Sequence, residues 1–298
     1  MCGRIRSSWG IRPGRWLKTK MKGCSVKHMR SREELESIAR RIRLGIAQMT
    51  HQSGLKGAHL GGSMSVADIL AVLYGDVLHC DVQNPLTPER DRVILSKAHA
   101  AVALYAALHE AGFLTDEDID HAMQGDSPFF EHPRMDPVHG IEFSGGSLGQ
   151  GLSLGMGTAL GMKKKGVPAK VYVILGDGEC DEGQVWEAAA AVIHFGLTNL
   201  TVIVDDNGLQ FDGRKEDILK AGKLEDRWAS LGFDVTVTDG HDVEMLRSTL
   251  LQEAEKPRVV IAKTVKGKGV RFAENEVTWH TGRLTDELYE EAIRDLND

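Results

Sequence analysis

The sequence predicts an α/β protein with a doubly wound, mainly parallel sheet flanked by helices. From Glu33 to the end of the chain, apolar runs of strand length alternate with segments of helix length, which is typical of parallel sheets. Two of these runs, 171–175 and 200–204, lie one helix length apart, so their strands should pair side by side. Residues 33–298 contain no recognisable linker or internal repeat, and we expect a single domain there.

The elements of the first half follow from spacing and capping signals. Apolar residues recur at helical spacing over 33–49, and Ser65 can cap a second helix. Residues 114–146 are proline-containing and irregular, which is typical of an active-site loop region. The predicted order is a helix at 33–49, a glycine-rich stretch at 54–62, a helix from Ser65, a strand at 92–96, a helix at 100–111 and the loop region 114–146.

The second half is predicted to alternate more regularly. A helix-length segment at 148–165 is rich in glycine, and each glycine inside a helix costs about 1 kcal/mol relative to alanine, so close backbone packing is expected there. The predicted elements that follow are strands at 171–175, 200–204, 233–237 and 258–264, and helices between the first two strands and at 223–231, 242–253 and 285–296.

Composition excludes several classes of protein. No apolar run approaches the roughly 20 residues of a membrane span. The net charge of −7 disfavours nucleic-acid binding by the body of the chain. The four cysteines have neither metal-type spacing nor a disulfide framework, and Cys180 is expected to be a packing residue. We therefore expect a cytoplasmic protein with no nucleic-acid or membrane partner.

Residues 1–32 form a basic segment with no acidic residue before Glu33. A transit peptide or an RNA-binding arm is one interpretation of such a leader. The other is an unstructured extension, or a start codon placed too far upstream, with Met21 or Met29 as the true start. We favour the second interpretation and expect residues 1–32 to be a disordered extension.

Asp177 and Asn207 each follow a predicted strand and lie at the same expected edge of the sheet. Ligands of open α/β sheets bind beyond this edge. The two oxygen side chains suit Mg²⁺, and a backbone carbonyl such as that of Leu209 could be a third ligand. Gly176 and Gly178 allow a phosphate to approach the following helix terminus. From spacing alone, a simple helix cap at Asp177 and a turn at Asn207 are equally consistent.

The spacing from Gly176-Asp177-Gly178 to Asn207 resembles the thiamine diphosphate signature, and further blocks resemble the transketolase family. The resemblance covers essentially all of 33–298. The blocks, in the family's order, are Ala58-His59-Leu60-Gly61-Gly62-Ser63, the run 90–100 ending in His99-Ala100, Glu131-His132-Pro133, Gly146-Ser147-Leu148-Gly149-Gln150-Gly151, Asp181-Glu182-Gly183, Lys263-Thr264-Val265-Lys266-Gly267 and Trp279-His280.

The resemblance implies roles for individual residues. Mg²⁺ or Ca²⁺ would be held by Asp177, Asn207 and the Leu209 carbonyl. The diphosphate would contact His99, Lys266, His280 and the Gly178 amide, and Gly146 and Leu148 would line the aminopyrimidine side. His59, His132 and His280 would face the reacting part of the sugar, since histidine exchanges protons near neutrality. Glu182 and Glu187 would lie at a subunit interface that links paired active sites, although both also suit a helix amino terminus.

Other positions limit the resemblance. Eight histidines match no motif and are treated as surface or structural: His28, His51, His79, His109, His121, His139, His194 and His241. Ala58, Ala98 and Glu131 stand where the family usually has glycine. These departures leave the cofactor site intact and leave the substrate open.

The resemblance also implies an incomplete enzyme, because the family's pyrimidine-binding domain follows the diphosphate-binding domain and supplies a glutamate to the cofactor. We expect the amino-terminal subunit of a split transketolase, inactive alone and assembled as α₂β₂ with a carboxyl-terminal subunit. It would transfer a two-carbon ketol unit between sugar phosphates, with either pentose phosphates or a branched or sulfonated sugar phosphate as substrate. The alternatives are a deoxyxylulose phosphate synthase, the α subunit of a 2-oxo acid dehydrogenase and a non-catalytic phosphate-binding module.

Overall fold

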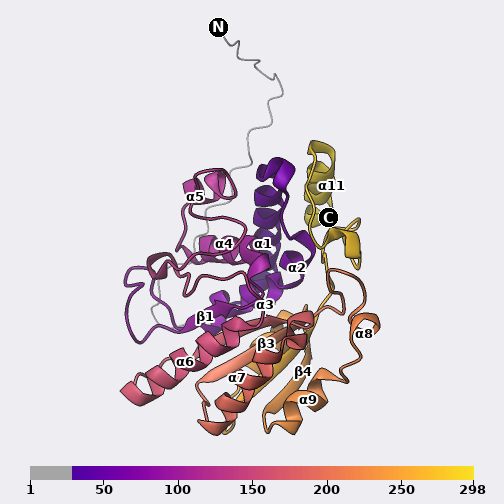
Figure 1. The fold of residues 1–298 in the computed structure, drawn as a ribbon. Coiled ribbons are helices and arrows are strands. Elements are labelled where there is room, and N and C mark those ends of the chain that lie inside the picture. Colours follow the sequence, from indigo (N-terminus) through magenta and orange to yellow (C-terminus); the bar gives the residue numbers. More distant parts are fainter. Residues whose placement is uncertain (1–28) are drawn as a thin grey trace.

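The computed structural model describes residues 29–298 and has a five-stranded, fully parallel sheet, which confirms the predicted fold class (Figure 1). The strand order across the sheet is β1-β2-β3-β5-β4. The strands are β1 (Arg92–Leu95), β2 (Val171–Gly176), β3 (Leu200–Asp206), β4 (Asp234–Asp239) and β5 (Arg258–Lys263). All five were predicted, with bounds that differ by one or two residues.

Helices cover both faces of this sheet, as expected of a doubly wound fold. Side chains alternate along β2, so that Val171 and Val173 join one core cluster while Tyr172 and Ile174 join the other. Helices α6, α7 and α9 pack on the first face, and α1, α3, α4 and α10 belong to the second (Figure 1). The helices are α1 (Arg32–Gln52), α2 (Leu60–Ser65), α3 (Ala67–Val72), α4 (Ala101–Ala111), α5 (Asp116–His121), α6 (Gln150–Lys165), α7 (Gly183–His194), α8 (Lys215–Ile218), α9 (Leu224–Ser230), α10 (Val243–Leu251) and α11 (Asp286–Asn297).

The helix expected near Ser65 is present as α3, which begins at Ala67, but the glycine-rich stretch before it is partly helical and Ser65 does not cap α3. Gly61 and Gly62 lie inside α2, and Ser65 ends that helix. The reason is close packing: a Cβ on Gly61 would lie 2.9 Å from both the Lys266 side chain and the Trp279 carbonyl oxygen. Gly61 therefore allows α2 to pack closely against the segments that carry Lys266 and Trp279.

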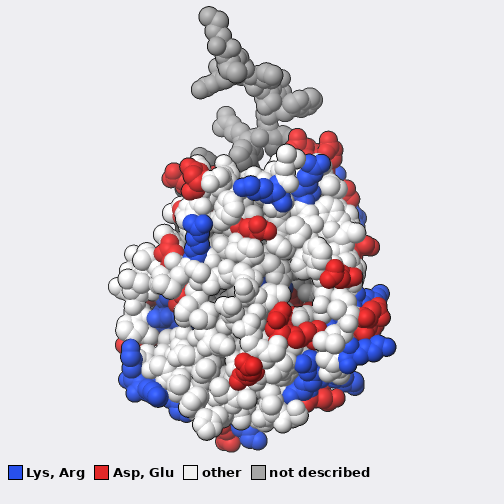
Figure 2. Space-filling model, viewed as in Figure 1, with Lys and Arg blue, Asp and Glu red and all other residues white. Residues whose placement is uncertain are grey.

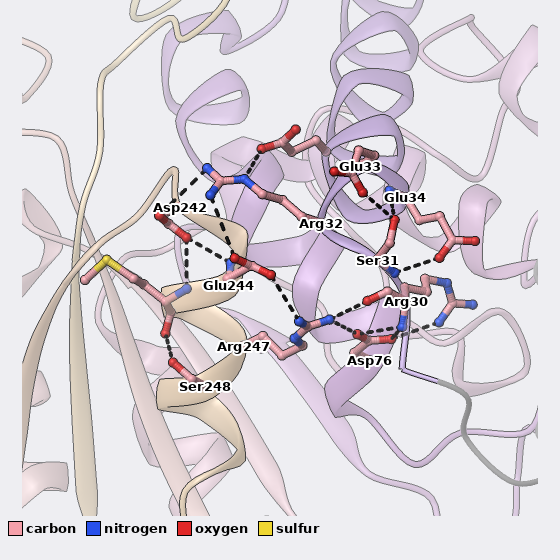
Figure 3. A network of polar contacts seen from close by, with 12 residues as sticks. Arg30, Ser31, Arg32, Glu33, Glu34, Asp76, Asp242, Glu244, Arg247 and Ser248 are labelled. Carbon is pink, nitrogen blue, oxygen red and sulfur yellow. Dashed lines mark hydrogen bonds and ion pairs between the residues drawn. The ribbon is translucent and has the colours of Figure 1, made fainter.

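The start of the folded body also differs from the expected boundary at Glu33 (Figure 3). Ser31 caps α1, which begins at Arg32, and Arg30 donates to the carboxylate of Asp76 and to the Gly75 carbonyl. Arg247 of α10 donates to the Arg30 carbonyl and pairs with Asp76 at 3.0 Å. Residues 29–32 thus belong to the folded body, whereas the expected disorder of residues 1–28 lies outside the described residues.

Charged side chains of both signs are scattered around the face seen in Figure 2, with a broad uncharged area over its middle. Within residues 29–298, no helix has both the length and the apolar character needed to cross a membrane.

Candidate functional site

Asp177 and Asn207 lie together at the carboxyl edge of the sheet, as predicted. Gly176, the last residue of β2, pairs with Asp205 of β3, which ends one residue later at Asp206. Asp177 and Asn207 therefore directly follow the ends of two neighbouring strands. The buried Asp177 carboxylate accepts a hydrogen bond of 2.8 Å from the Gly208 amide. The Asn207 side-chain oxygen accepts one of 3.2 Å from the Leu209 amide.

Burial raises the pKa of Asp177 to about 7, and Asp206 and Asp205 act in the same direction while Lys215 opposes them. A carboxylate in such surroundings gains from a bound cation, which restores its charged form. The described residues contain no group of three or more His, Cys, Asp or Glu that could hold a metal ion. A metal at this edge would therefore need amide or carbonyl oxygens in addition to Asp177.

Lys266 approaches the same edge from the loop after β5. Its ammonium group donates to the carbonyls of Leu209 at 3.1 Å and Gln210 at 3.2 Å, and lies 2.9 Å from His280 Nδ1. Burial, reinforced by nearby Lys97, lowers the pKa of Lys266 to about 8. Lys266 thus connects the loop that carries the expected metal ligands to one of the expected site histidines.

The four histidines singled out by the sequence meet beside this lysine, although they come from four separate segments. The ring centroid of His59 lies 5.3 Å from that of His99, 6.2 Å from that of His132 and 5.5 Å from that of His280. Burial lowers the pKa of His99 well below its usual value and that of His280 to about 3. The imidazoles of His99 and His280 therefore stay neutral in the free chain, and each can donate a hydrogen bond from one ring nitrogen and accept one at the other.

One polar atom of this cluster is left without a partner. His59 Nδ1 is buried and forms no hydrogen bond with any residue in 29–298. The nearest carboxylate oxygen, on Glu131, is 3.7 Å away, which is too far for a hydrogen bond. Buried polar groups are nearly always paired, so an unpaired nitrogen on one of the clustered histidines is consistent with a polar ligand.

The loop that carries Gly146 and Leu148 is held to the site by a residue that the sequence analysis missed. Glu179 is buried, and its carboxylate accepts hydrogen bonds from the amides of Gly149 at 2.7 Å and Gly176 at 3.0 Å and from the Ser96 hydroxyl at 2.5 Å. Burial raises its pKa. Glu179 follows Gly178 directly, but the sequence does not reveal that it is buried.

A second missed feature is the buried ion pair of Lys97 and Asp205 under the histidines. Lys97 also donates to the Gly62 carbonyl at 2.8 Å, and Asp205 accepts from the Ser65 hydroxyl at 2.6 Å. Lys97 is the residue two before His99, so its position in the expected block was a usable signal.

The remaining expectations concern residues near the Gly176-Asp177-Gly178 turn. Cys180 is fully buried and burial raises its pKa well above the usual value, which fits a packing role. Glu182 and Glu187 are both exposed on the described chain, and their role at a subunit interface stays a prediction. Gly178 packs closely, since a Cβ there would lie 2.7 Å from the Gln210 side chain.

These residues fit a diphosphate with a divalent cation. The buried Lys266 and the partly buried histidines lie beside the edge of the sheet at which Asp177 and Asn207 offer oxygen ligands, and Gly178 directly follows Asp177. A parallel sheet with such an arrangement at its carboxyl edge is what we expect of a thiamine diphosphate-binding domain, the class that the sequence resembles.

Residues 36–296 match the family model described as transketolase, thiamine diphosphate binding domain. The chain therefore belongs to the transketolase family. It is 39% identical over 241 residues to the 6-deoxy-6-sulfo-D-fructose transketolase subunit SqwG of a Clostridium species, covering 80% of this chain and 88% of that protein. It is 38% identical over 270 residues to an apulose-4-phosphate transketolase subunit of Actinobacillus succinogenes, covering 90% of this chain and 98% of the relative.

Full-length transketolases align with the chain over part of their own length. Human transketolase is 34% identical over 265 residues, which cover 89% of this chain and 42% of the human protein. The crystal structure of transketolase from Campylobacter jejuni superposes with a TM-score of 0.83 at 29% identity, covering 90% of this chain and 43% of that one. The fold and the family are thus established independently of the histidine cluster.

Proposed function

We propose that this chain is the amino-terminal, thiamine diphosphate-binding subunit of a split transketolase. The complete enzyme would transfer a two-carbon ketol unit from a ketose phosphate to an aldose acceptor. The observation that carries the proposal is the meeting of His59, His99, His132 and His280 beside the edge that bears Asp177 and Asn207. A simple phosphate-binding module gives no reason for four histidines at that place.

The cofactor would be held at its diphosphate end. Mg²⁺, or Ca²⁺, would be bound by Asp177, Asn207 and the Leu209 carbonyl, with His99, Lys266, His280 and the Gly178 amide on the diphosphate. Gly176 lets the chain turn toward the ligand, and Gly146 and Leu148 would line the aminopyrimidine side. Thiamine diphosphate, when bound, supplies the carbon nucleophile that carries the ketol unit.

The protein would provide position and proton transfer. His59, His132 and His280 would form hydrogen bonds to the sugar hydroxyls and assist proton transfer there, and general acid–base catalysis of this kind contributes typically about 10²–10⁴-fold. His59 has the orphan nitrogen that such a contact would satisfy.

A partner subunit completes the proposal. The Clostridium and Actinobacillus relatives match this chain over 88% and 98% of their own length, and both are named as transketolase subunits. We propose that a carboxyl-terminal transketolase subunit with the pyrimidine-binding domain joins this chain in an α₂β₂ complex in the cytoplasm. The exposed Glu182 and Glu187 would lie at an interface of that complex.

The same relatives favour a specialised sugar over the ordinary pentose phosphates. One is named for 6-deoxy-6-sulfo-D-fructose and another for apulose-4-phosphate. We therefore propose a branched or sulfonated sugar phosphate as the substrate class to test first, with pentose phosphates as the second. The substitutions at Ala58, Ala98 and Glu131 lie next to three of the four site histidines, where substrate selection would be made.

Co-expression with a candidate carboxyl-terminal transketolase subunit, sought first among the products of adjacent genes, tests the proposal. The purified complex should contain thiamine diphosphate and should transfer a ketol unit from at least one donor in a panel of pentose, branched and sulfonated sugars. Asp177→Ala should remove cofactor binding. Pyruvate consumption instead of ketol transfer would favour a 2-oxo acid dehydrogenase or deoxyxylulose phosphate synthase, and a complex with neither cofactor nor activity would contradict the proposal.

A further inference from the structure

His241, which the sequence analysis placed among surface or structural histidines, connects two distant parts of the fold. It lies between β4 and α10, with its side chain 16% exposed. Its Nδ1 lies 2.7 Å from the Asp68 carboxylate of α3. Its Nε2 lies 2.8 Å from the backbone nitrogen of Val265, in the loop after β5.

These two contacts fix the proton on the ring. The Val265 amide can only donate, so Nε2 must carry the lone pair that accepts this hydrogen bond. Nδ1 therefore carries the proton and donates to Asp68. The two contacts thus select one tautomer of the imidazole and fix its orientation at both ring nitrogens.

The Asp68 end is a rigid anchor. Asp68 is buried and forms an ion pair with Arg43 of α1. Burial acts to raise the pKa of Asp68, but Arg43 and the His241 hydrogen bond outweigh it and hold the pKa below its usual value. A charged carboxylate in this position holds the donor side of His241 firmly.

The Val265 end leads to Lys266. The neighbouring amides are bonded to backbone, Thr264 to the Asp206 carbonyl at 3.1 Å and Gly267 to the Gly61 carbonyl at 3.0 Å. Between them, the Val265 amide is held by the His241 side chain. The Lys266 carbonyl also accepts from the Asn275 amide at 2.8 Å, so the backbone here is held at several points, and His241 holds the one directly before Lys266.

We propose that His241 is a positioning residue for the diphosphate end of the cofactor site, acting through the Val265 amide on Lys266. This inference rests on the proposed function, since it takes Lys266 to be a diphosphate ligand. His241 does not touch the expected ligand itself. Partners of ligating groups typically change ligand affinity by about 10–100-fold when mutated.

Two substitutions separate the two ends of the imidazole. The amide of His241→Gln reaches the position of Nε2, so its oxygen can still accept from Val265. The shorter amide of His241→Asn reaches the position of Nδ1 and can donate to Asp68, but it leaves the Val265 amide without an acceptor. His194→Asn, on the exposed face of α7, is the matched control.

Hydrogen–deuterium exchange in the free chain is the first readout. His241→Asn should speed exchange in the peptide that contains Val265, while His241→Gln and His194→Asn should leave it near the wild-type rate. Equal exchange in wild type and His241→Asn would overturn the proposal. If His241→Asn does not fold, His241→Gln provides the test. The peptide that contains Val265 should exchange as slowly in His241→Gln as in the wild type, and faster exchange there would overturn the proposal.

Calorimetric titration of the two-subunit complex with thiamine diphosphate and Mg²⁺ is the second readout. His241→Asn should raise the dissociation constant about 10–100-fold, and it should have no further effect in a Lys266→Met background. An equal effect of His241→Asn in both backgrounds would show that Lys266 is not the link and would overturn the proposal. A wild-type complex that binds no cofactor would instead refute the proposed function, and the exchange result alone would then decide the role of His241.

Discussion

The ammonium group of Lys266 lies 2.9 Å from Nδ1 of His280; Lys266 is buried in the free chain and His280 is partly buried. The same ammonium donates to the Leu209 carbonyl, a proposed metal ligand. One lysine thus holds together the two sides of the proposed diphosphate site before any ligand is present.

Replacement of Lys266 by methionine should weaken cofactor binding without unfolding the chain. Hydrogen bonds to charged groups contribute about 1.5–3 kcal/mol, so the dissociation constant for thiamine diphosphate with Mg²⁺ should rise roughly 10–100-fold. Because burial disfavours the ammonium, the thermal stability of the free chain should be unchanged or higher. Calorimetry and thermal melts check both results.

Lys268→Met is the control for this change, since Lys268 lies in the same loop with a half-exposed side chain. It should leave the dissociation constant at the wild-type value. Equal binding by wild type and Lys266→Met would show that Lys266 does not contact the diphosphate.

The buried neutral state of His280 predicts a pH dependence of stability. Burial, with Lys266 and His59, lowers its pKa to about 3, against 6.5 for an ordinary histidine. The unfolded chain therefore binds more protons between about pH 6.5 and 3, so the stabilising contribution of the neutral ring is lost as pH falls through that window. Urea unfolding of the free chain at several pH values measures this effect.

His280→Gln should flatten that dependence, because the variant has no proton to gain at this position. The exposed His194→Gln should retain the full wild-type slope. The same pH dependence in wild type and His280→Gln would mean that other groups cause the acid destabilisation.

The sequence predicted the sheet and its functional edge because strand ends and their order follow from apolar runs and chain length. Asp177 and Asn207 could therefore be placed together. The meeting of His59 with His280 could be expected only through the family resemblance, since more than 200 positions separate them and no local pattern joins them.

Glu179 and His241 show what local patterns cannot reveal. Glu179 reads as an acidic residue in a turn, yet it is buried, and it accepts hydrogen bonds from Ser96 after β1, from Gly149 before α6 and from Gly176 at the end of β2. His241 reads as an isolated histidine, and its two partners are 173 and 24 positions away. The position of Gly61 inside α2 could not be predicted either, because glycine is required there by contact with Lys266 and Trp279, which are distant in the sequence.

Glu179→Ala should destabilise the free chain. Three buried donors, on Ser96, Gly149 and Gly176, would lose their acceptor, and each buried unsatisfied group costs about 1–3 kcal/mol. A loss of several kcal/mol in the free energy of unfolding is expected from urea denaturation. Glu187→Ala, at an exposed position of α7, should change it little, and a similar small change for Glu179→Ala would contradict the assigned network.

Gly61→Ala should disturb the site through Lys266. The added Cβ would lie 2.9 Å from the Lys266 side chain and from the Trp279 carbonyl, so the loop must move away. Weaker cofactor binding and a lower melting temperature are expected.

Gly157→Ala in α6 provides the matched comparison, because a Cβ there has no atom within 4 Å. It should stabilise the helix by up to about 1 kcal/mol and leave binding unchanged. If Gly61→Ala melts and binds as Gly157→Ala does, the close approach of α2 to the Lys266 loop is not required for the site.

A titration of this chain with the separately purified partner subunit, in the presence of thiamine diphosphate and Mg²⁺, tests the central claim most directly. Ketol-transfer activity should be absent for either chain alone, rise as the partner is added and level off at equal amounts of the two chains. Full ketol transfer by this chain without a partner, or none at any ratio, would contradict its role as one subunit of a split transketolase.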